Sequence, residues 1–501
     1  MKLEKMIKDI SLELIKGDLN IDIKNIAHDS RKIAADYLFI CIKGFKTDGH
    51  HYIQDAIDNG AKAILIEKEP DTFEQGITYI KVNDTRKAMS SLAAAFYNYP
   101  LEDLKLIGVT GTNGKTTTTY LIKSVLDTAG YKTGLIGTIQ NLIDEETLPA
   151  TRTTPKSLDI YRLLDKMRNQ NIDYVVMEVS SHALDLKRVE GMNFTTAVFT
   201  NISQDHLDYH ETLEKYLEVK SKLFKQVDKS GYSVVNLDDN KSDKIIKNNN
   251  GKLFTYSIDN PSDLRAQNVE VRPDGVSFQL PDLQKKINLN IAGLFNVYNA
   301  LAAFGVGKVL GLNAESIKNG LEVINGVAGR FELIKEEQDF TVVVDYAHTP
   351  DGMENVLETV QDLTPGKTIV VFGCGGDRDK GKRPLMGKVG VKYGDYCIIT
   401  SDNPRSEDPE MIINDIEQGI KEFSTTTKYT VITDRKKAIH YAINLANNGD
   451  SIVIFGKGHE TYQVFKDKTI HFDDREVARK AINNLVKKGE DANGANADRR
   501  D

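Results

Sequence analysis

The sequence predicts an α/β protein of three domains, with a mainly parallel sheet in the centre and a doubly wound sheet near the C-terminus. A length of 501 residues is typical of about three domains. A glycine-rich loop near residue 112 separates a strand-like run from a helical pattern. Strand-like and helical runs alternate regularly from 329 to 488, which is the pattern of a parallel sheet with helices on both faces.

The expected domains are an N-terminal domain at 1–100, a central domain at 101–328 and a C-terminal domain at 329–488. Pro100 marks the first boundary. Residues 489–501 are polar and are expected to form a disordered tail.

Composition and charge narrow the class of protein. The chain is 40% hydrophobic and 28% charged, as in an ordinary globular enzyme. Its net charge of −8 argues against a nucleic-acid or anionic-membrane partner. The sequence shows neither an apolar run of membrane-spanning length nor an N-terminal signal core. Cys41, Cys374 and Cys397 are scattered, as free thiols of a reducing compartment are. We therefore expect a cytoplasmic protein that does not insert into membranes, with a monomer as the default.

The N-terminal domain alternates strand-like and helical runs. Ahead of them, His28, Asp29, Ser30 and Arg31 form a polar cluster beside a strand. The residues alone favour a helix cap or a turn at this cluster.

The central domain begins with a predicted phosphate-binding loop of the P-loop type. Its pattern is Gly111-x-x-Gly114-Lys115-Thr116, and Val109 stands where the usual P-loop has its first glycine. Glycines let backbone N–H groups converge on an anion, and the helix that follows adds its positive end. Lys115 is expected to reach the outer phosphates and Thr116 to hold Mg²⁺. A simple turn would explain the glycines but not the Lys-Thr pair.

Two further strands of this domain end in polar residues. Glu178 closes an apolar strand and is a candidate ligand of Mg²⁺, although a strand cap is the plain alternative. Asp205 and His206 lie on a loop after the next strand, with Asp208 and His210 close by, and a histidine pair alone is weak evidence for a metal. Strands expected to carry the sheet onward are 233–236, 253–257, 276–280 and 287–291.

A long helix is expected to follow this sheet. Asn296 and Asn299 lie one turn apart at its start, where they would cap the helix or touch a ligand.

The C-terminal domain is predicted to be Rossmann-like, with strands at 341–345, 368–372, 396–400, 430–432 and 451–455. Ligands of such sheets bind outside the carboxyl ends of the strands. Four polar clusters follow strands, at 345–348, 373–379, 401–405 and 456–460. Four polar clusters along the same edge of the sheet, at the carboxyl ends of its strands, indicate a ligand-binding site.

Together these motifs resemble the Mur ligase family, the ATP-dependent enzymes that build the stem peptide of peptidoglycan. The resemblance covers nearly the whole chain and rests on the motifs at 110–117, 178–182, 205–210 and 345–350. Asp402-Asn-Pro-Arg405 resembles the members that add diaminopimelate, because lysine-adding members usually lack the arginine.

The resemblance implies ligation of meso-2,6-diaminopimelate to the D-glutamate of UDP-N-acetylmuramoyl-L-alanyl-D-glutamate through an acyl phosphate. ATP and Mg²⁺ would be required. Catalytic residues would be Lys115, His206 and Lys220. By resemblance Lys220 would be carbamylated, whereas sequence alone favours an exposed helix lysine beside Lys222.

The resemblance also assigns binding residues. ATP would be bound by Gly111, Thr112, Asn113, Gly114, Lys115, Thr116, Thr117, Asn299, Arg330 and Asp345. The metal ligands would be Thr116, Glu178, His206 and carbamylated Lys220. The UDP-muramoyl dipeptide would be held by Ser30 and its neighbours and by Thr153, Thr154, Ser180 and Arg188. Leu186 departs from the pattern, since some members have glutamine there. The diaminopimelate pocket would use Arg378, Asp402, Asn403, Arg405, Gly456 and Glu460.

Four alternatives stay open. A lysine-adding member or a folylpolyglutamate synthetase would share the Gly-Thr-Asn-Gly-Lys loop, but the N-terminal domain and the Asp-Asn-Pro-Arg sequence argue against the folate enzyme. A P-loop kinase or a non-catalytic nucleotide-binding module would leave the four-loop rim unexplained.

Overall fold

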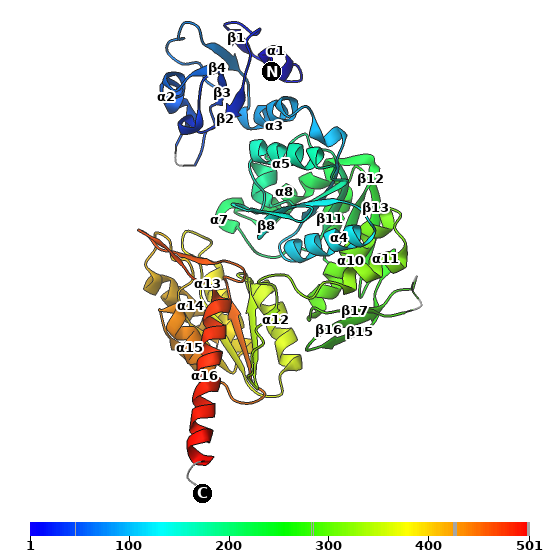
Figure 1. Cartoon of the computed structure of the whole chain (residues 1–501), viewed down its shortest axis with the longest axis vertical. Helices are drawn as coiled ribbons and strands as arrows, with labels where there is room; N and C mark the ends of the chain where they lie inside the picture. The colour runs from blue at the N-terminus through cyan, green and yellow to red at the C-terminus, as the bar shows by residue number, and fades with distance from the viewer. Residues whose placement is uncertain (46, 282, 284, 424–427, 498–501) are drawn as a thin grey trace.

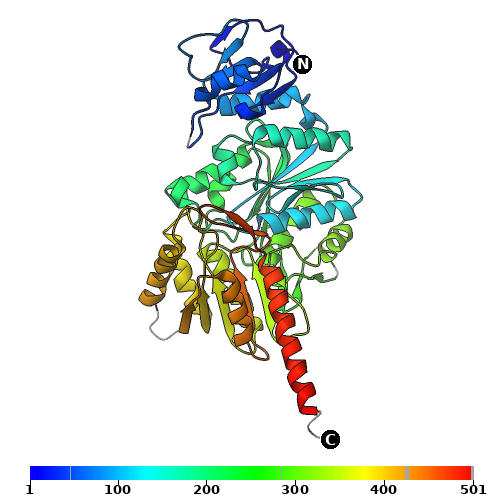
Figure 2. The same ribbon diagram turned by 60° about the vertical axis from the view of Figure 1, so that its left-hand side comes forward.

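The computed structural model describes all residues except 46, 282, 284, 424–427 and 498–501. We call residues 1–100 the N-terminal unit, 101–328 the central unit and 329–488 the C-terminal unit. The three units follow one another along the long axis of the molecule, with the N-terminal unit at one end and the C-terminal unit at the other (Figures 1 and 2). Each unit contains a mostly parallel sheet with helices, so the predicted α/β class is confirmed.

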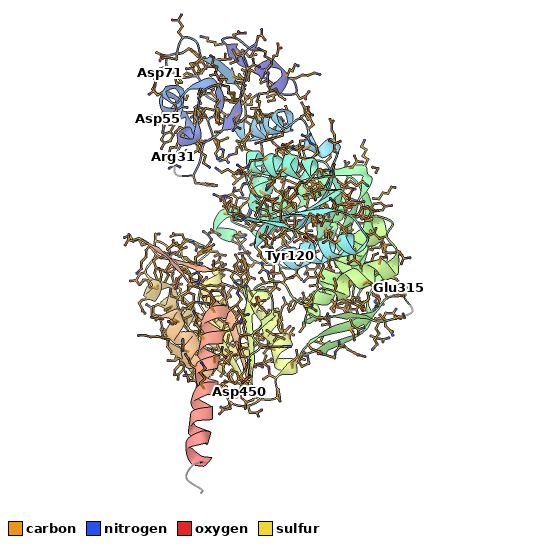
Figure 3. All side chains as sticks on the ribbon, in the orientation of Figure 1. Arg31, Asp55, Asp71, Tyr120, Glu315 and Asp450 are labelled. Carbon is orange, nitrogen blue, oxygen red and sulfur yellow. The ribbon has the colours of Figure 1, made fainter. Side chains whose placement is uncertain are left out.

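The N-terminal unit has a five-stranded sheet in the order β1-β5-β4-β3-β2, in which β1 alone runs antiparallel to its neighbour. Its strands are β1 (Leu14–Lys16), β2 (Asn25–Ala27), β3 (Tyr37–Ile40), β4 (Ala61–Ile66) and β5 (Thr78–Lys81). Its α-helices are α1 (Leu3–Met6), α2 (Ile53–Asp58) and α3 (Thr85–Phe96). Asp29 accepts a hydrogen bond from the backbone N–H of Arg31 and caps a 3₁₀ turn, so the predicted cap is confirmed. Arg31 lies on the side of this unit that faces the other two (Figure 3).

The central unit is built on a nine-stranded sheet in the order β14-β13-β12-β11-β6-β10-β7-β8-β9. Its strands are β6 (Lys105–Thr110), β7 (Thr133–Ile136), β8 (Gln140–Ile143), β9 (Glu146–Pro149), β10 (Tyr174–Glu178), β11 (Phe194–Phe199), β12 (Val227–Asn236), β13 (Lys252–Ser257) and β14 (Leu264–Arg265). The strands from β14 to β7 are parallel, and β8 and β9 add an antiparallel edge.

Helices cover both faces of this sheet. One core lies beneath α4 (Lys115–Thr128), α10 (Leu294–Val309) and α11 (Ala314–Glu322). The other lies beneath α5 (Ser157–Asn169), α6 (Ser181–Asp185), α8 (Leu213–Lys225) and α9 (Ser242–Lys247), while α7 (Leu207–His210) precedes α8. This arrangement places the carboxyl ends of β6, β10 and β11 side by side, because Val109 pairs with Glu178 and Thr110 with Phe199.

The prediction that 276–280 and 287–291 carry the main sheet onward is wrong. Both lie in a separate antiparallel sheet of β15 (Gln267–Arg272), β16 (Gly275–Gln279) and β17 (Ile287–Leu289), which packs on α10. The physical reason is the two-residue turn Pro273-Asp274 between β15 and β16. A tight hairpin makes antiparallel neighbours, whereas a parallel neighbour needs a long crossover connection.

The C-terminal unit contains a six-stranded sheet in the order β18-β19-β23-β20-β21-β22, and all pairs except β18–β19 are parallel. Its strands are β18 (Glu332–Leu333), β19 (Thr341–Asp345), β20 (Thr368–Phe372), β21 (Tyr396–Ile399), β22 (Lys428–Val431) and β23 (Ser451–Phe455). One face is covered by α12 (Pro350–Leu363), α13 (Lys382–Tyr393) and α14 (Pro409–Phe423), and the other by α15 (Arg435–Leu445) and α16 (Asp474–Ala497). A small hairpin of β24 (Tyr462–Val464) and β25 (Thr469–His471) precedes α16. The doubly wound prediction is confirmed.

Helix α16 continues through Ala497 and projects beyond the sheet, where a disordered tail was expected from residue 489 (Figure 1). Its first turns pack on the core, and extending a packed helix by one residue needs no new nucleation. The segment 489–497 contains no proline that would end the helix. The last part of the predicted tail, 498–501, lies outside the described residues.

A fully buried ion pair ties α16 to the rest of the C-terminal unit. Arg435 donates two hydrogen bonds to Asp474, both at 2.7 Å, and a third to the carbonyl of Phe455 at 2.7 Å.

We expect Arg435→Met to lower the free energy of unfolding by about 3–5 kcal/mol, because Asp474 would stay buried without its cation. Urea unfolding measures this. Lys392→Met, which breaks an exposed pair with Glu354, is the matched control and should cost under about 1 kcal/mol. Equal losses in both variants would contradict the expectation.

Candidate functional site

A cavity of about 950 Å³ lies between the central and C-terminal units and is also lined by Phe45 of the N-terminal unit. Lys115 and Arg405 line this same cavity, so the two ends of the predicted site are brought together. The predicted residues in its wall are Thr112, Asn113, Gly114, Lys115, Thr116, Thr117, Thr153, Thr154, Glu178, Ser180, Arg188, His206, Lys220, Asn299, Arg330, Asp345, Arg378, Asp402, Asn403, Arg405, Gly456 and Glu460. Of the predicted residues, Gly111 and Ser30 lie outside the wall.

The predicted phosphate loop runs from the end of β6 into α4, whose N-cap is Gly114 with φ 84°. Only glycine fits its two key positions. A Cβ at Gly111 would come within 1.8 Å of the Thr200 hydroxyl, and one at Gly114 within 2.4 Å of Asn299 Oδ1. Lys115 Nζ donates to the carbonyls of Gly111 and Thr112 at 2.9 and 2.7 Å. The loop is therefore a tight cradle closed by a partly buried lysine, and loss of hydration lowers the pKa of that lysine.

Asn299 completes this cradle from α10. Its Oδ1 accepts from the Thr118 hydroxyl at 3.2 Å, and its Nδ2 donates to Asn296 Oδ1 at 2.9 Å. The N-cap of α10 is Gly293, and neither asparagine caps the helix with its side chain. The cap interpretation is therefore wrong, and Asn299 supports the phosphate loop instead.

Glu178 is fully buried at the end of β10, where its carboxylate faces the phosphate loop. It accepts hydrogen bonds from the Thr116 hydroxyl at 3.0 Å and from the backbone and hydroxyl of Thr138 at 2.8 and 2.9 Å. Arg330 of the C-terminal unit donates to the same Thr116 hydroxyl at 2.9 Å. The Thr116 hydroxyl therefore links the Glu178 carboxylate of the central unit to the Arg330 guanidinium of the C-terminal unit.

Arg330 is held in turn by its neighbours. Its guanidinium lies 4.4 Å from the centre of the Tyr346 ring. Asp345, at the end of β19, accepts from the backbone N–H groups of Phe331 and Ala347, each at 2.6 Å. Burial raises the pKa of Asp345, and the nearby Arg330 opposes that rise.

Lys220 is buried in α8, with 1% of its surface exposed, so the interpretation as an ordinary exposed lysine is wrong. Its Nζ donates to the carbonyl of Gly111 at 2.7 Å and lies 4.5 Å from the centre of the Tyr216 ring. Burial, followed by the charge of Lys115, holds its pKa well below the usual range. The amine is therefore uncharged and nucleophilic more often than a surface lysine is.

His206 lies on the loop after β11 in the left-handed conformation, with φ 55°. Its Nε2 is 3.3 Å from Asp205 Oδ2, and burial lowers the pKa of His206 to about 3. Asp205 also faces His348 Nε2 at 4.0 Å and Lys382 Nζ at 3.6 Å, both from the C-terminal unit. These charges hold the pKa of Asp205 below its usual range against the effect of burial.

The end of the cavity that the sequence predicts to bind the amino acid is formed by loops at the carboxyl ends of β20, β21 and β23. Asn403 Nδ2 donates to Glu460 Oε2 at 2.8 Å. Arg405 adopts φ 54°, and its Nη1 donates to the carbonyl of Gly376 at 2.6 Å. Burial lowers the pKa of Arg405, as does the nearby charge of Arg378. Cationic and acidic groups therefore line one pocket.

A third group of predicted residues lies beside Glu178. Thr154 donates to the carbonyl of Glu178 at 2.8 Å and to the Ser180 hydroxyl at 3.1 Å. Arg188 Nη1 donates to the carbonyl of Thr154 at 2.8 Å, and burial lowers the pKa of Arg188 to about 10.

The polar cluster of the N-terminal unit stays apart from the cavity. Arg31 binds Asp29 through two hydrogen bonds of 2.9 Å, and the Ser30 carbonyl accepts from Asn59 Nδ2 at 3.2 Å. His28 Nε2 lies 2.6 Å from Lys156 Nζ, which joins the cluster to the central unit.

Several residues of the site were missed by sequence reasoning. Lys382 meets Asp205, and Asp351 accepts hydrogen bonds from Asn113 and Ser203 at 2.7 and 3.0 Å. Thr138 donates hydrogen bonds to Glu178, and Lys457 donates to Asn403 from behind the predicted amino-acid pocket. Of these four residues, only Lys457 lies in a segment that the sequence had marked as part of the site, the polar cluster at 456–460.

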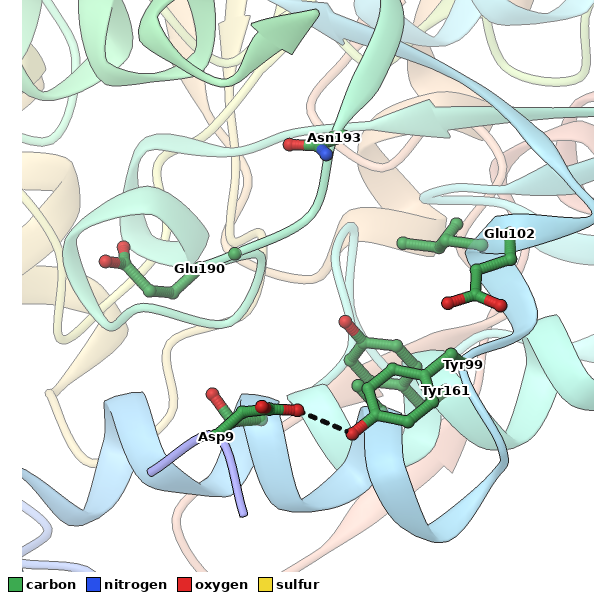
Figure 4. Close-up of a pocket in the computed structure, with 10 residues that line it drawn as sticks. Asp9, Tyr99, Glu102, Tyr161, Glu190 and Asn193 are labelled. Carbon is green, nitrogen blue, oxygen red and sulfur yellow. Dashed lines mark hydrogen bonds between the residues drawn. The ribbon is translucent and has the colours of Figure 1, made fainter. Parts of the chain in front are cut away.

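A second cavity, of about 250 Å³, lies between the N-terminal and central units (Figure 4). The Tyr99 hydroxyl donates to Asp9 Oδ2 at 2.8 Å there, with Glu102 and Tyr161 in the wall. None of the predicted site residues lines it, so the first cavity is the candidate site.

Within the described part of the chain, no group of three or more histidine, cysteine or acidic side chains is arranged to hold a metal ion. Every helix described is too short or too polar to cross a bilayer.

Comparison with known families matches all three units. Residues 22–97 match the family description "Mur ligase family, catalytic domain". Residues 109–307 match "Mur ligase middle domain", and 329–458 match "Mur ligase, glutamate ligase domain".

Individual relatives agree with the family matches. The chain is 49% identical to UDP-N-acetylmuramoyl-L-alanyl-D-glutamate--2,6-diaminopimelate ligase of Caldanaerobacter subterraneus over 96% of this chain and 99% of that protein. It is 47% identical to the Bacillus velezensis protein of the same name, over 97% and 100%. A solved structure under that name is 33% identical, with a TM-score of 0.67 over 97% and 99% of the two chains. MurF ligase of Thermotoga maritima, in complex with ADP, shares the fold at 18% identity, with a TM-score of 0.62 over 93% and 97%. The chain therefore belongs to the Mur ligase family.

Proposed function

We propose that this chain is an ATP-dependent ligase that joins meso-2,6-diaminopimelate to the D-glutamate of UDP-N-acetylmuramoyl-L-alanyl-D-glutamate. The product would be the UDP-linked tripeptide used in peptidoglycan synthesis. The observation that carries this proposal is the shared cavity, which is lined by both the Lys115 cradle and the Arg405 pocket. The names of the full-length relatives support the same reaction.

ATP would be bound where the central and C-terminal units meet. The loop 111–117 would cradle its phosphates, with Asn299, Arg330 and Asp345 around it. Gly111 and Gly114 support this, because a side chain at either position would collide with its neighbours, whereas an anion needs the bare backbone. The partly buried Lys115 would supply positive charge for the phosphates.

Mg²⁺ would be held by Thr116 and Glu178, whose oxygens are 3.0 Å apart. The residues fit the ion, because Mg²⁺ takes oxygen ligands, and one or two from the protein suffice when phosphates and waters supply the rest. The ion would neutralise charge on the phosphates.

A second Mg²⁺ would be held by His206 and carbamylated Lys220. In the modification, the uncharged Lys220 amine attacks carbon dioxide, forms an N–C bond and releases one proton, which leaves a carbamate anion. The lowered pKa of Lys220 supports this step, since the protonated amine has no lone pair to attack with.

Amide formation requires an electrophilic carboxyl group. The D-glutamate carboxylate would take the terminal phosphoryl group of ATP, and the amine of diaminopimelate would then displace phosphate from this acyl phosphate. Lys115 and Arg330 are the cations beside the phosphate loop that stabilise the negative charge of this transfer.

The two other substrates would occupy opposite ends of the cavity. The muramoyl dipeptide would contact Thr153, Thr154, Ser180 and Arg188, and its UDP moiety would extend out of the cavity to Ser30 and its neighbours. Diaminopimelate would contact Arg378, Asp402, Asn403, Arg405, Gly456 and Glu460. Its second carboxylate suits the forked guanidinium of Arg405, and its ammonium suits Glu460.

We also propose that the three units are the domains of a monomeric, cytoplasmic enzyme. The sheets support these boundaries, since each main sheet lies within one unit.

An amino-acid specificity assay tests the proposed function. We expect ADP and phosphate release only when the UDP-muramoyl dipeptide and meso-diaminopimelate are both present with ATP. L-Lysine should be a poor substrate, because it would leave the buried charges around Arg405 unpaired. Turnover with L-lysine equal to that with diaminopimelate would refute the specificity, and turnover with a folate substrate would refute the assigned reaction.

A further inference from the structure

Lys457 has a fully buried side chain in the loop after β23, although none of the substrate contacts proposed above uses it. A lysine is almost never buried unless its ammonium group is paired. Its neighbours Gly456 and Glu460 line the cavity, so Lys457 lies directly behind the wall of the amino-acid pocket.

The ammonium group of Lys457 is surrounded by oxygens of that wall. Its Nζ donates to Asn403 Oδ1 at 2.9 Å and to the carbonyl of Tyr462 at 2.7 Å. It also lies 3.4 Å from Asp402 Oδ1 and 3.6 Å from Glu460 Oε2. One buried cation therefore contacts three side chains that face the cavity.

These contacts fix the orientation of the Asn403 amide. Its Oδ1 accepts from Lys457 and from the backbone N–H of Val464, at 2.9 Å each, while its Nδ2 donates to Glu460. An ammonium group has donors and no acceptor. Rotating the amide by half a turn would set N–H groups against two donors and oxygen against a carboxylate. Lys457 thereby also sets the position of the Glu460 carboxylate.

Lys457 also compensates the negative charge of the pocket. Asp402 Oδ1 is buried and has no hydrogen-bond partner among the described residues, and the Lys457 ammonium lies 3.4 Å from it, within ion-pair distance. Burial raises the pKa of Glu460, and Asp402 raises it further, whereas Lys457 and Arg405 lower it. Glu460 interacts electrostatically with six charged or titratable groups, which are Asp402, Lys457, Arg405, Tyr346, Tyr462 and Arg435.

We propose that Lys457 is a positioning residue for the amino-acid substrate, which locks Asn403 in one orientation and balances the negative charge of Asp402 and Glu460. It acts through these three residues, and its burial keeps it from the substrate itself. The inference rests on the proposed function, because it assigns the pocket to a diamino acid whose ammonium meets those carboxylates.

Steady-state kinetics of the full-length Lys457→Met variant test this. We expect KM for meso-diaminopimelate to rise roughly 10- to 100-fold, since Asn403 Oδ1 and two carboxylates lose a buried partner. KM for ATP and for the UDP-muramoyl dipeptide should stay within about twofold, because their proposed sites lie elsewhere in the cavity. Lys392→Met, the same change at an exposed position of the same unit, is the control and should match the wild type in all three constants.

The pH profile gives a second readout. Removing Lys457 takes away a group that lowers the pKa of Glu460, so Glu460 should become ionised only at higher pH. The acidic limb of kcat/KM for diaminopimelate should therefore move to higher pH in Lys457→Met. If that variant does not fold, Lys457→Gln replaces it: the glutamine amide keeps an N–H donor and lacks the charge, so it should show the shifted limb with a smaller rise in KM.

The kinetic constants and the pH profile together distinguish a positioning role of Lys457 from a general structural role. An unchanged KM for diaminopimelate together with an unchanged acidic limb overturns the proposal, and so does an equal loss for all three substrates, which marks a general structural role. Failure of the proposed function is seen separately, since the wild-type enzyme would then not turn over diaminopimelate at all.

Discussion

Lys220→Ala should lose roughly 100-fold or more of its turnover, as is typical when a charge stabiliser of the transition state is removed. The residue is buried beside the phosphate loop, with its Nζ on the carbonyl of Gly111. If Lys220 carries a carbamate, the variant lacks an anion that would hold the second Mg²⁺. Turnover is measured as ADP release in the presence of both other substrates.

A short carboxylic acid such as acetate should restore part of this activity. Truncation to alanine leaves space in the buried site, and acetate brings a carboxylate of the kind the carbamate would supply. Lys222→Ala, two residues further along the same helix and half exposed, is the matched control and should keep its activity without rescue. Loss of turnover with no response to acetate would contradict carbamylation of Lys220.

Arg405→Ala should weaken the use of diaminopimelate by about 2–5 kcal/mol in kcat/KM, the usual cost of removing one partner from a buried charge pair. The guanidinium lies in the pocket with Asp402 and Glu460, and Asp402, Glu460 and Asp377 oppose the lowering of its pKa by burial. Arg405→Lys should recover only part of the loss, because lysine keeps the charge but not the forked geometry.

Kinetics with each substrate varied in turn measure the effect of Arg405→Ala. The loss should appear in KM for diaminopimelate, with KM for ATP nearly unchanged. Arg479→Ala, on the partly exposed start of α16, is the control in the same unit and should behave like the wild type. Full activity of Arg405→Ala would show that the amino-acid pocket is assigned wrongly.

Local patterns in the sequence predicted the elements that carry the site. The glycines and the Lys-Thr pair predicted the turn from β6 into α4, because both signals lie within a few residues. The regular alternation after residue 340 predicted the parallel C-terminal sheet, and parallel pairing then placed its polar loops on one rim. The hairpin of β15 and β16 was misassigned, since the apolar pattern of a strand does not say which sheet it joins.

The sequence alone did not predict the contacts of the candidate site between residues that are far apart in the chain. Lys382 and Asp205 are far apart in the chain, and their ion pair exists only because the central and C-terminal units meet. Lys457 lies within a predicted cluster, but its burial behind Asn403 follows from how three loops pack.

By itself, the sequence determined the three α/β units, the phosphate cradle and the presence of charged loops at the carboxyl ends of strands, because these depend on spacing between near neighbours. The tertiary structure decided which of those loops share one cavity and that Lys220 is buried beside Gly111. Burial and charge at a site are set by residues that arrive from other parts of the chain, so a lysine that looks ordinary in the sequence becomes a buried amine with a lowered pKa only in the folded protein.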